Sequence, residues 1–176
     1  MKTGTLVRRF LTPGFLVTFR AWRKYGCRIS PKAEVEITPH LTIGRDSIIG
    51  SFTKVKATDG PLTIGSNVEI ATGCVITSHA GGVEIGDDCM IGPNVSILGN
   101  NYRYDRLDVP MRLQEKVSPK GIRIGRDVWI GAGCVLLDGA HIGDGSIVTP
   151  NSVVSGPLPE RSIAQGNPAR VIFTRR

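Results

Sequence analysis

Aromatic residues are scarce in this sequence: Phe, Trp and Tyr account for 6% of it, although 40% of its residues are hydrophobic. No apolar run reaches the roughly 18 residues that a membrane-spanning helix requires. The N-terminal apolar stretch also ends without the small-residue cleavage site of a secretory signal, so we expect a cytoplasmic protein. The 22 Gly and 11 Pro among 176 residues favour many short strands joined by tight turns over a helical bundle.

Cysteine motifs are missing as well. The four cysteines, Cys27, Cys74, Cys89 and Cys134, form no CxxC pair and match no zinc-ligand spacing. Three of them recur at one small, apolar position of the repeat described below. We therefore expect all four to be packed in the core and expect no metal site.

Acidic residues are absent from residues 1–33, which contain eight of the 22 Lys and Arg residues. The rest of the chain has 22 − 8 = 14 cations against 15 acids, so the net charge of +7 belongs to the N-terminal arm. A nucleic-acid-binding domain should carry its positive charge on the folded surface, and this distribution argues against one.

What the sequence does contain is a six-residue repeat of aliphatic residues. From Ile124 it continues without a break, and upstream it appears in groups of three hexads, as at Ile43, Ile64 and Ile85. Three short strands per turn would produce this period, with small residues such as Gly125 at the corners. The pattern predicts an all-β fold, a left-handed parallel β-helix of hexapeptide repeats. Its coils begin at Ile43, Ile64, Ile85, Ile124 and Ile142.

The spacing of the coils predicts the domain organisation. Successive coils start 21, 21, 39 and 18 residues apart, and the extra residues always enter after the third hexad, at one corner. We expect a basic amphipathic helical arm over 1–28, the β-helix over 29–158 with a long functional loop at 101–121, and a C-terminal cap over 159–176. Stacking predicts that His79 and Asn100 are neighbours at the root of that loop.

Three segments carry a family resemblance: IRIGRDVWIGAGCVLLDGAHIGDGSIV (122–148), IAQGNPARVI (163–172) and NYRYDRLDVPMRLQ (101–114). Over about residues 35–173 the chain resembles the hexapeptide acyltransferases, in the branch of maltose, galactoside and polysaccharide O-acetyltransferases. The resemblance implies a homotrimer with active sites between subunits, acetyl-CoA as co-substrate and a sugar or glycan acceptor. The positions that match the family's CoA contacts are Trp129, Ala132, Pro150, Ser155, Gly156 and Arg170. Many relatives have lysine at the position of Gly156.

The catalytic histidine of that family falls on Tyr102. A tyrosine with a pKa of about 10 is a poor general base near neutral pH. His79 could serve as the base, with Tyr102 or Asn100 orienting the acceptor, or it could only bind substrate or fill the corner. Alternatively, the acceptor is an amine that needs little help from a base. The candidate catalytic residues are therefore His79 and Tyr102, and the candidate acceptor-binding residues are Asn100, Asn101 and Tyr104. A third interpretation is a catalytically silent homologue that binds a ligand or partner through the same groove. His40, His79 and His141 occupy different repeat positions, too far apart to share a metal ion.

The N-terminal arm combines aromatic and aliphatic residues with cations over residues 5–24, and Pro13-Gly14 should divide it into two short helices. Such helices suit the interface of an anionic membrane. They could equally pack on the open end of the β-helix, and both can hold. We therefore predict an enzyme of surface polysaccharide biosynthesis that is cytoplasmic, with peripheral contact at the inner face of the cell membrane.

Overall fold

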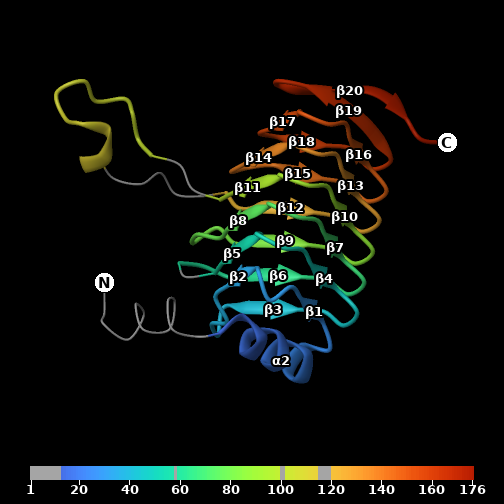
Figure 1. Ribbon diagram of the computed structural model, residues 1–176. Helices are drawn as coiled ribbons and strands as arrows, with labels where there is room; N and C mark the ends of the chain where they lie inside the picture. The colour runs from blue at the N-terminus through green and yellow to red at the C-terminus, as the bar shows by residue number, and fades with distance from the viewer. Residues whose placement is uncertain (1–12, 58, 100–101, 115–119) are drawn as a thin grey trace.

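The computed structural model describes residues 13–57, 59–99, 102–114 and 120–176, and within them it is a three-sided column of short parallel strands (Figure 1). Sheet A contains β1 (Arg28–Ile29), β4 (Ile48–Ile49), β7 (Glu69–Ile70), β10 (Met90–Ile91), β13 (Trp129–Ile130), β16 (Ile147–Val148), β19 (Ser162–Gly166) and β20 (Ala169–Thr174). Sheet B contains β2 (Glu34–Val35), β5 (Lys54–Lys56), β8 (Val75–Thr77), β11 (Ser96–Leu98), β14 (Val135–Leu137) and β17 (Val153–Val154). Sheet C contains β3 (Leu41–Ile43), β6 (Leu62–Ile64), β9 (Val83–Ile85), β12 (Ile122–Ile124), β15 (His141–Ile142) and β18 (Pro157–Leu158).

The chain visits the sheets in the order A, B, C in each coil, so the column has an A–B, a B–C and a C–A corner. Each strand pairs in register with the strands of the coils before and after it, as Ile43 with Ile64 and Ile64 with Ile85. The predicted coil starts are therefore confirmed. A further coil precedes them and is formed by β1, β2 and β3.

Aliphatic residues of the repeat fill the core. Ile124, Ile130, Leu136 and Ile142 are at most 3% exposed, and their equivalents in the earlier coils are buried as well. The four cysteines are free thiols and are buried, as predicted. Desolvation raises the pKa of the Cys89 thiol to about 11. Packing rather than chemistry therefore accounts for these residues.

A helix covers the first coil. Helix α2 (Gly14–Tyr25) starts directly after Pro13, where we expected an interruption, and ends at Gly26, whose φ of 68° lies in the left-handed region. The Thr18 hydroxyl donates to the carbonyl oxygen of Ile29 (2.8 Å), and the Tyr25 hydroxyl donates to that of Leu41 (2.9 Å). The helix expected before Pro13 lies outside the described residues.

A hairpin covers the other end of the column. Strand β20 turns back antiparallel on β19, the last strand that pairs with the parallel part of sheet A. Beyond it, the Arg175 guanidinium donates to the carbonyl oxygen of Gly145 (2.6 Å) and lies 3.6 Å from the Asp127 carboxylate. Both ends of the column are thus covered by other segments of the chain.

The long loop leaves the column at the B–C corner, and its described part, Tyr102–Gln114, extends well away from the sheets (Figure 1). A short 3-10 helix, η1 (Met111–Leu113), precedes Gln114, whose side-chain amide donates to the carbonyl oxygens of Arg106 (2.7 Å) and Val109 (2.9 Å). These internal bonds give the loop a shape of its own. Its return to the column is held at Asp138, whose carboxylate accepts from the backbone amides of Lys120 and Gly121.

Candidate active site

The B–C corner collects the residues that follow each strand of sheet B. Thr77 pairs with Lys56 in the coil before it and with Leu98 in the coil after it. His79 lies two residues beyond Thr77. In the sequence of the neighbouring coils, the residues two places after Lys56 and two places after Leu98 correspond to it. The predicted neighbour Asn100, and Asn101 beside it, lie outside the described residues. Their proximity to His79 therefore stays a prediction.

The described partner of His79 at this corner is Asp59. The imidazole Nδ1 lies 3.4 Å from a carboxylate oxygen of Asp59, and the two side chains are 18% and 55% exposed. The separation is longer than a good hydrogen bond. Catalytic contacts are often loose before substrate binds. A carboxylate at Nδ1 favours the tautomer that leaves Nε2 free to accept a proton.

A close backbone approach makes this contact possible. A Cβ on Gly60 would lie 1.8 Å from the carbonyl oxygen of His79, so only glycine fits beside it. The same oxygen accepts from the amide of Gly82 (2.8 Å), which closes the turn into β9. The small insertions near Asp59 and Ala80 therefore shape the surroundings of His79. Sequence reasoning selected His79 and missed Asp59.

Two of the predicted loop residues are described and exposed. Tyr102, which the sequence predicts to stand where the family has its histidine, is 45% exposed, and Tyr104 is 71% exposed. Their position at the start of the loop is compatible with the acceptor-side role predicted for them.

The predicted CoA-binding residues lie in the last coils but on different sides of the column. Trp129 projects from sheet A and is 46% exposed, whereas Ala132 and Pro150 occupy successive turns of the A–B corner. Ser155 and Gly156 follow β17 near the B–C corner, and Arg170 lies on β20. One chain does not gather these residues into a single cavity. A Cβ on Gly156 would meet no atom within 4 Å, so the lysine of relatives would fit there.

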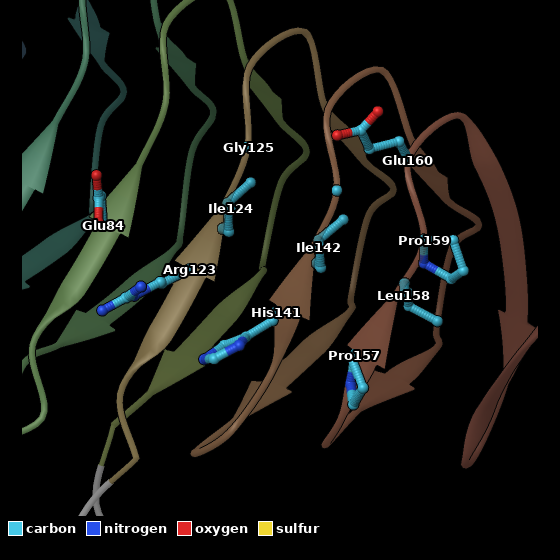
Figure 2. A pocket seen from close by; sticks show the side chains of 11 residues that line it. Glu84, Arg123, Ile124, Gly125, His141, Ile142, Pro157, Leu158, Pro159 and Glu160 are labelled. Carbon is cyan, nitrogen blue, oxygen red and sulfur yellow. The ribbon is translucent and has the colours of Figure 1, made fainter.

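Sheet C carries a hollow that sequence reasoning did not anticipate. Arg123 pairs with Glu84 on one side and with His141 on the other, and all three side chains project from the outer surface of the sheet (Figure 2). Together with Pro157 and Glu160 they line a shallow depression of about 480 Å³. The signal was available, because Glu84, Arg123 and His141 each precede the coil-starting isoleucine. Among the described residues, no group of three His, Cys, Asp or Glu side chains could hold a metal ion.

Comparison with known proteins identifies the family. The model of the bacterial transferase hexapeptide (six repeats) matches residues 121–156, and that of the hexapeptide repeat of succinyl-transferase matches residues 80–99. The "Putative lipopolysaccharide biosynthesis O-acetyl transferase WbbJ" of Escherichia coli is 34% identical, over 85% of this chain and 76% of its own length. The "Probable acetyltransferase Rv3034c" of Mycobacterium tuberculosis is 30% identical, over 97% of this chain and 61% of its own length.

Solved structures agree on the fold. A variant of AntD, an N-acyltransferase from Bacillus cereus in complex with dTDP and coenzyme A, superposes with a TM-score of 0.77 at 22% identity, covering 90% of this chain and 88% of that one. The hexapeptide-repeat acetyltransferase VCA0836 of Vibrio cholerae, complexed with acetyl coenzyme A, gives 0.53 at 24% identity, covering 96% and 81%.

The chain therefore belongs to the hexapeptide-repeat transferase family, as its sequence predicted, and its column is the left-handed parallel β-helix of that family. It spans 61% and 54% of the length of the first two curated relatives it matches, the mycobacterial protein and a yeast protein named as an acetyltransferase. Within the described residues, no helix is both long and apolar enough to cross a bilayer.

Proposed function

We propose that this protein transfers an acyl group, in the first instance acetyl, from acyl-CoA to a hydroxyl or amino group of a sugar. Its relatives are named as acetyltransferases, and AntD was crystallised with coenzyme A and dTDP-4-amino-4,6-dideoxyglucose. The observation that carries the proposal is the contact between His79 and Asp59 at the corner where the long loop begins. In this proposal the His79–Asp59 pair supplies the general base, because a tyrosine, Tyr102, is predicted at the position of the family's catalytic histidine.

In the proposed reaction His79 Nε2 takes the proton of the acceptor hydroxyl as its oxygen attacks the thioester carbonyl. The new C–O bond forms, the C–S bond then breaks, and the imidazolium returns the proton to the departing CoA sulfur. The Asp59 carboxylate holds the tautomer and stabilises the imidazolium while it lasts. With an amine acceptor the nitrogen attacks through its own lone pair, and His79 removes the proton that the product nitrogen loses.

The remaining site residues bind the two substrates in this proposal. Tyr102, Asn100, Asn101 and Tyr104 contact the acceptor. The CoA-binding residues are Trp129, Ala132, Pro150, Ser155, Gly156 and Arg170. The Arg170 guanidinium is suited to a CoA phosphate, because its planar array of donors matches phosphate oxygens.

We also propose that the protein is a homotrimer with active sites between subunits. Ala132 and Pro150 lie at the A–B corner of one chain, whereas Ser155 and Gly156 lie near its B–C corner, so a complete site would combine corners of two chains. The outer side of sheet B supports the same assembly, because apolar side chains that are not fully buried stand on several of its strands, namely Val75, Leu98, Val135, Leu137 and Val153. Neighbouring apolar side chains on a surface often mark a site that another subunit covers.

The biological setting we propose is surface polysaccharide biosynthesis in the cytoplasm, with peripheral contact at the inner face of the cell membrane through residues 5–24. The name of the Escherichia coli relative, which refers to lipopolysaccharide biosynthesis, supports this setting.

The test is incubation with acetyl-CoA and a panel of nucleotide-linked sugars and amino sugars. Release of the CoA thiol and the mass of the product would be measured, alongside CoA affinity by calorimetry. We expect an acetylated sugar and stoichiometric thiol. CoA binding without turnover on any acceptor would instead favour the alternative, a catalytically silent scaffold that binds a ligand or partner through the same groove.

A further inference from the structure

Helix α2 has one side against the column and a different side exposed. Ala21 is fully buried, and Val17 and Tyr25 pack beside it on the core. Phe15, Phe19 and Trp22 are 64%, 55% and 60% exposed. Their spacing of four and then three residues places them on one helix face. The rings of Phe19 and Trp22 lie 6.2 Å apart. We call this the aromatic face of α2.

Cations surround the aromatic face. Arg20, Arg23 and Lys24 belong to the same helix, and all three are exposed. Arg28 on β1 and Lys32 in the next turn are exposed at the same end of the column. No acidic residue occurs among residues 1–33 to offset these charges.

A fourth exposed aromatic ring belongs to the coil that follows. Phe52 is 65% exposed in the turn between sheets A and B, and the Lys32 ammonium lies 5.6 Å from its ring centroid. The backbone amide of Phe52 donates to the carbonyl oxygen of Lys32, which fixes the two turns against each other. The capped end of the column thus exposes four large aromatic side chains among cations.

We propose that this end is a membrane-docking surface for anionic phospholipid, with α2 lying in the plane of the bilayer interface. Aromatic rings insert at the boundary between headgroups and acyl chains, while arginine and lysine bind lipid phosphates above them. The arrangement matches that chemistry, because the rings are exposed and cations of the same helix lie beside them. The phosphates of the lipid headgroups would supply the negative charge that residues 1–33 lack.

Charge also distinguishes this occupant from a second copy of the chain. Two copies that met through the aromatic face would bring two cation-rich helices together, and like charges in contact oppose binding. An anionic bilayer would instead attract these cations. It also allows several aromatic residues to be buried at once without a shaped partner surface.

Vesicle binding by the full-length protein tests this proposal. Vesicles of phosphatidylcholine alone would be compared with vesicles in which about a third of the lipid is phosphatidylglycerol. We expect binding to the anionic vesicles only, weakened in about 0.5 M NaCl because salt screens the exposed cations. A Trp129→Phe background would make Trp22 the sole tryptophan, and its fluorescence should shift to the blue on binding.

Two surface variants separate the contributions. Phe15→Ser/Phe19→Ser/Trp22→Ser and Arg20→Gln/Arg23→Gln/Lys24→Gln should each lower the partition coefficient at least about tenfold. Their thermal unfolding should stay close to wild type, because the substituted side chains are exposed. Phe173→Ser is the matched control, since Phe173 is 67% exposed at the opposite end of the column. It should bind vesicles as the wild type does.

Three results would overturn the proposal: equal binding to neutral and anionic vesicles, wild-type binding by both triple variants, or self-association that the triple variants abolish. A fourth result would overturn it as well: RNA displaces the protein from vesicles, and both triple variants lose RNA binding. That result would indicate a nucleic-acid-binding surface instead. Vesicle binding is measured without turnover. Its failure therefore leaves the proposed acyl transfer standing, and an inactive protein could still bind membranes.

Discussion

His79 and Asp59 belong to consecutive coils of the β-helix, 20 residues apart in sequence, and their side chains meet with Nδ1 3.4 Å from a carboxylate oxygen. Asp59 lies in a small insertion at the B–C corner, whereas His79 occupies a regular position of the repeat, just before the insertion of the next coil. The insertion after the first of these two coils therefore supplies the carboxylate that contacts His79. The contact with Asp59 gives the His79 imidazole a defined orientation at this corner.

Replacement of His79 by alanine should reduce kcat for a hydroxyl acceptor on the order of 10²-fold or more, because the acceptor loses its base. Steady-state kinetics with acetyl-CoA in excess would measure this. His40→Ala is the matched control, since His40 is exposed and occupies a different repeat position. A loss under about threefold for His79→Ala would remove this residue from the role of base.

Replacement of Asp59 by asparagine should lower kcat roughly tenfold and leave KM for acetyl-CoA unchanged, because the carboxylate acts through the imidazole and not on CoA. The effect should be smaller than in buried triads, since Asp59 is 55% exposed. Asp59→Glu should restore part of the rate. With three histidines in the chain, nitrogen NMR can also report the His79 tautomer. An Asp59→Asn protein with the wild-type tautomer and rate would show that the contact is incidental.

Introduction of lysine at Gly156 should tighten CoA binding by about threefold to tenfold, because a cation near a CoA phosphate adds a charge-assisted bond. The site has room for the side chain. Calorimetry at two salt concentrations would detect both the gain and its screening. Thr63→Lys adds the same charge on sheet C, four strands away from β18, and should leave the affinity unchanged. Equal gains for both variants would indicate a general charge effect.

The native thiols should react slowly with a disulfide reagent near pH 8 and all four should react after denaturation. Desolvation raises the pKa of Cys89 to about 11 from its ordinary value of 9.0, so the thiolate is disfavoured in the fold. As the pH rises from about 9 toward 11, the unfolded chain loses the Cys89 proton first and the folded state is destabilised. Rapid reaction of any thiol in the native protein near pH 8 would contradict the buried positions.

The column itself could be predicted from the sequence, because a six-residue period has few structural explanations. Each coil-starting isoleucine also shows where its coil begins. His79 could be selected because it stands at a fixed distance from Ile76. Asp59 could not, since the insertions obey no period and side-chain contacts across them depend on turn geometry. Arg123 and Glu84 were missed for another reason. The repeat is recognised by the buried residues of each strand, whereas the outward residues stand at a fixed place before each coil-starting isoleucine but differ in type from coil to coil.

The predicted contacts of Asn100 and Asn101 stay predictions, because both residues lie outside the described part of the chain. The helix after Pro13 could be expected from the proline and the amphipathic pattern. Which of its faces would be exposed could not, because Ala21 looks no more suited to burial than Phe19 until the first coil is present.

The confinement of every insertion to the B–C corner has a consequence for how such proteins can diversify. The other two corners keep the six-residue spacing, as from Ile43 to Ile49 and from Ile49 to Val55. The B–C corner contains three extra residues or a long loop, and the strands on both sides of it still pair in register. A new acceptor specificity could therefore be grafted there by exchanging one turn, while the scaffold and its donor-side residues stay as they are.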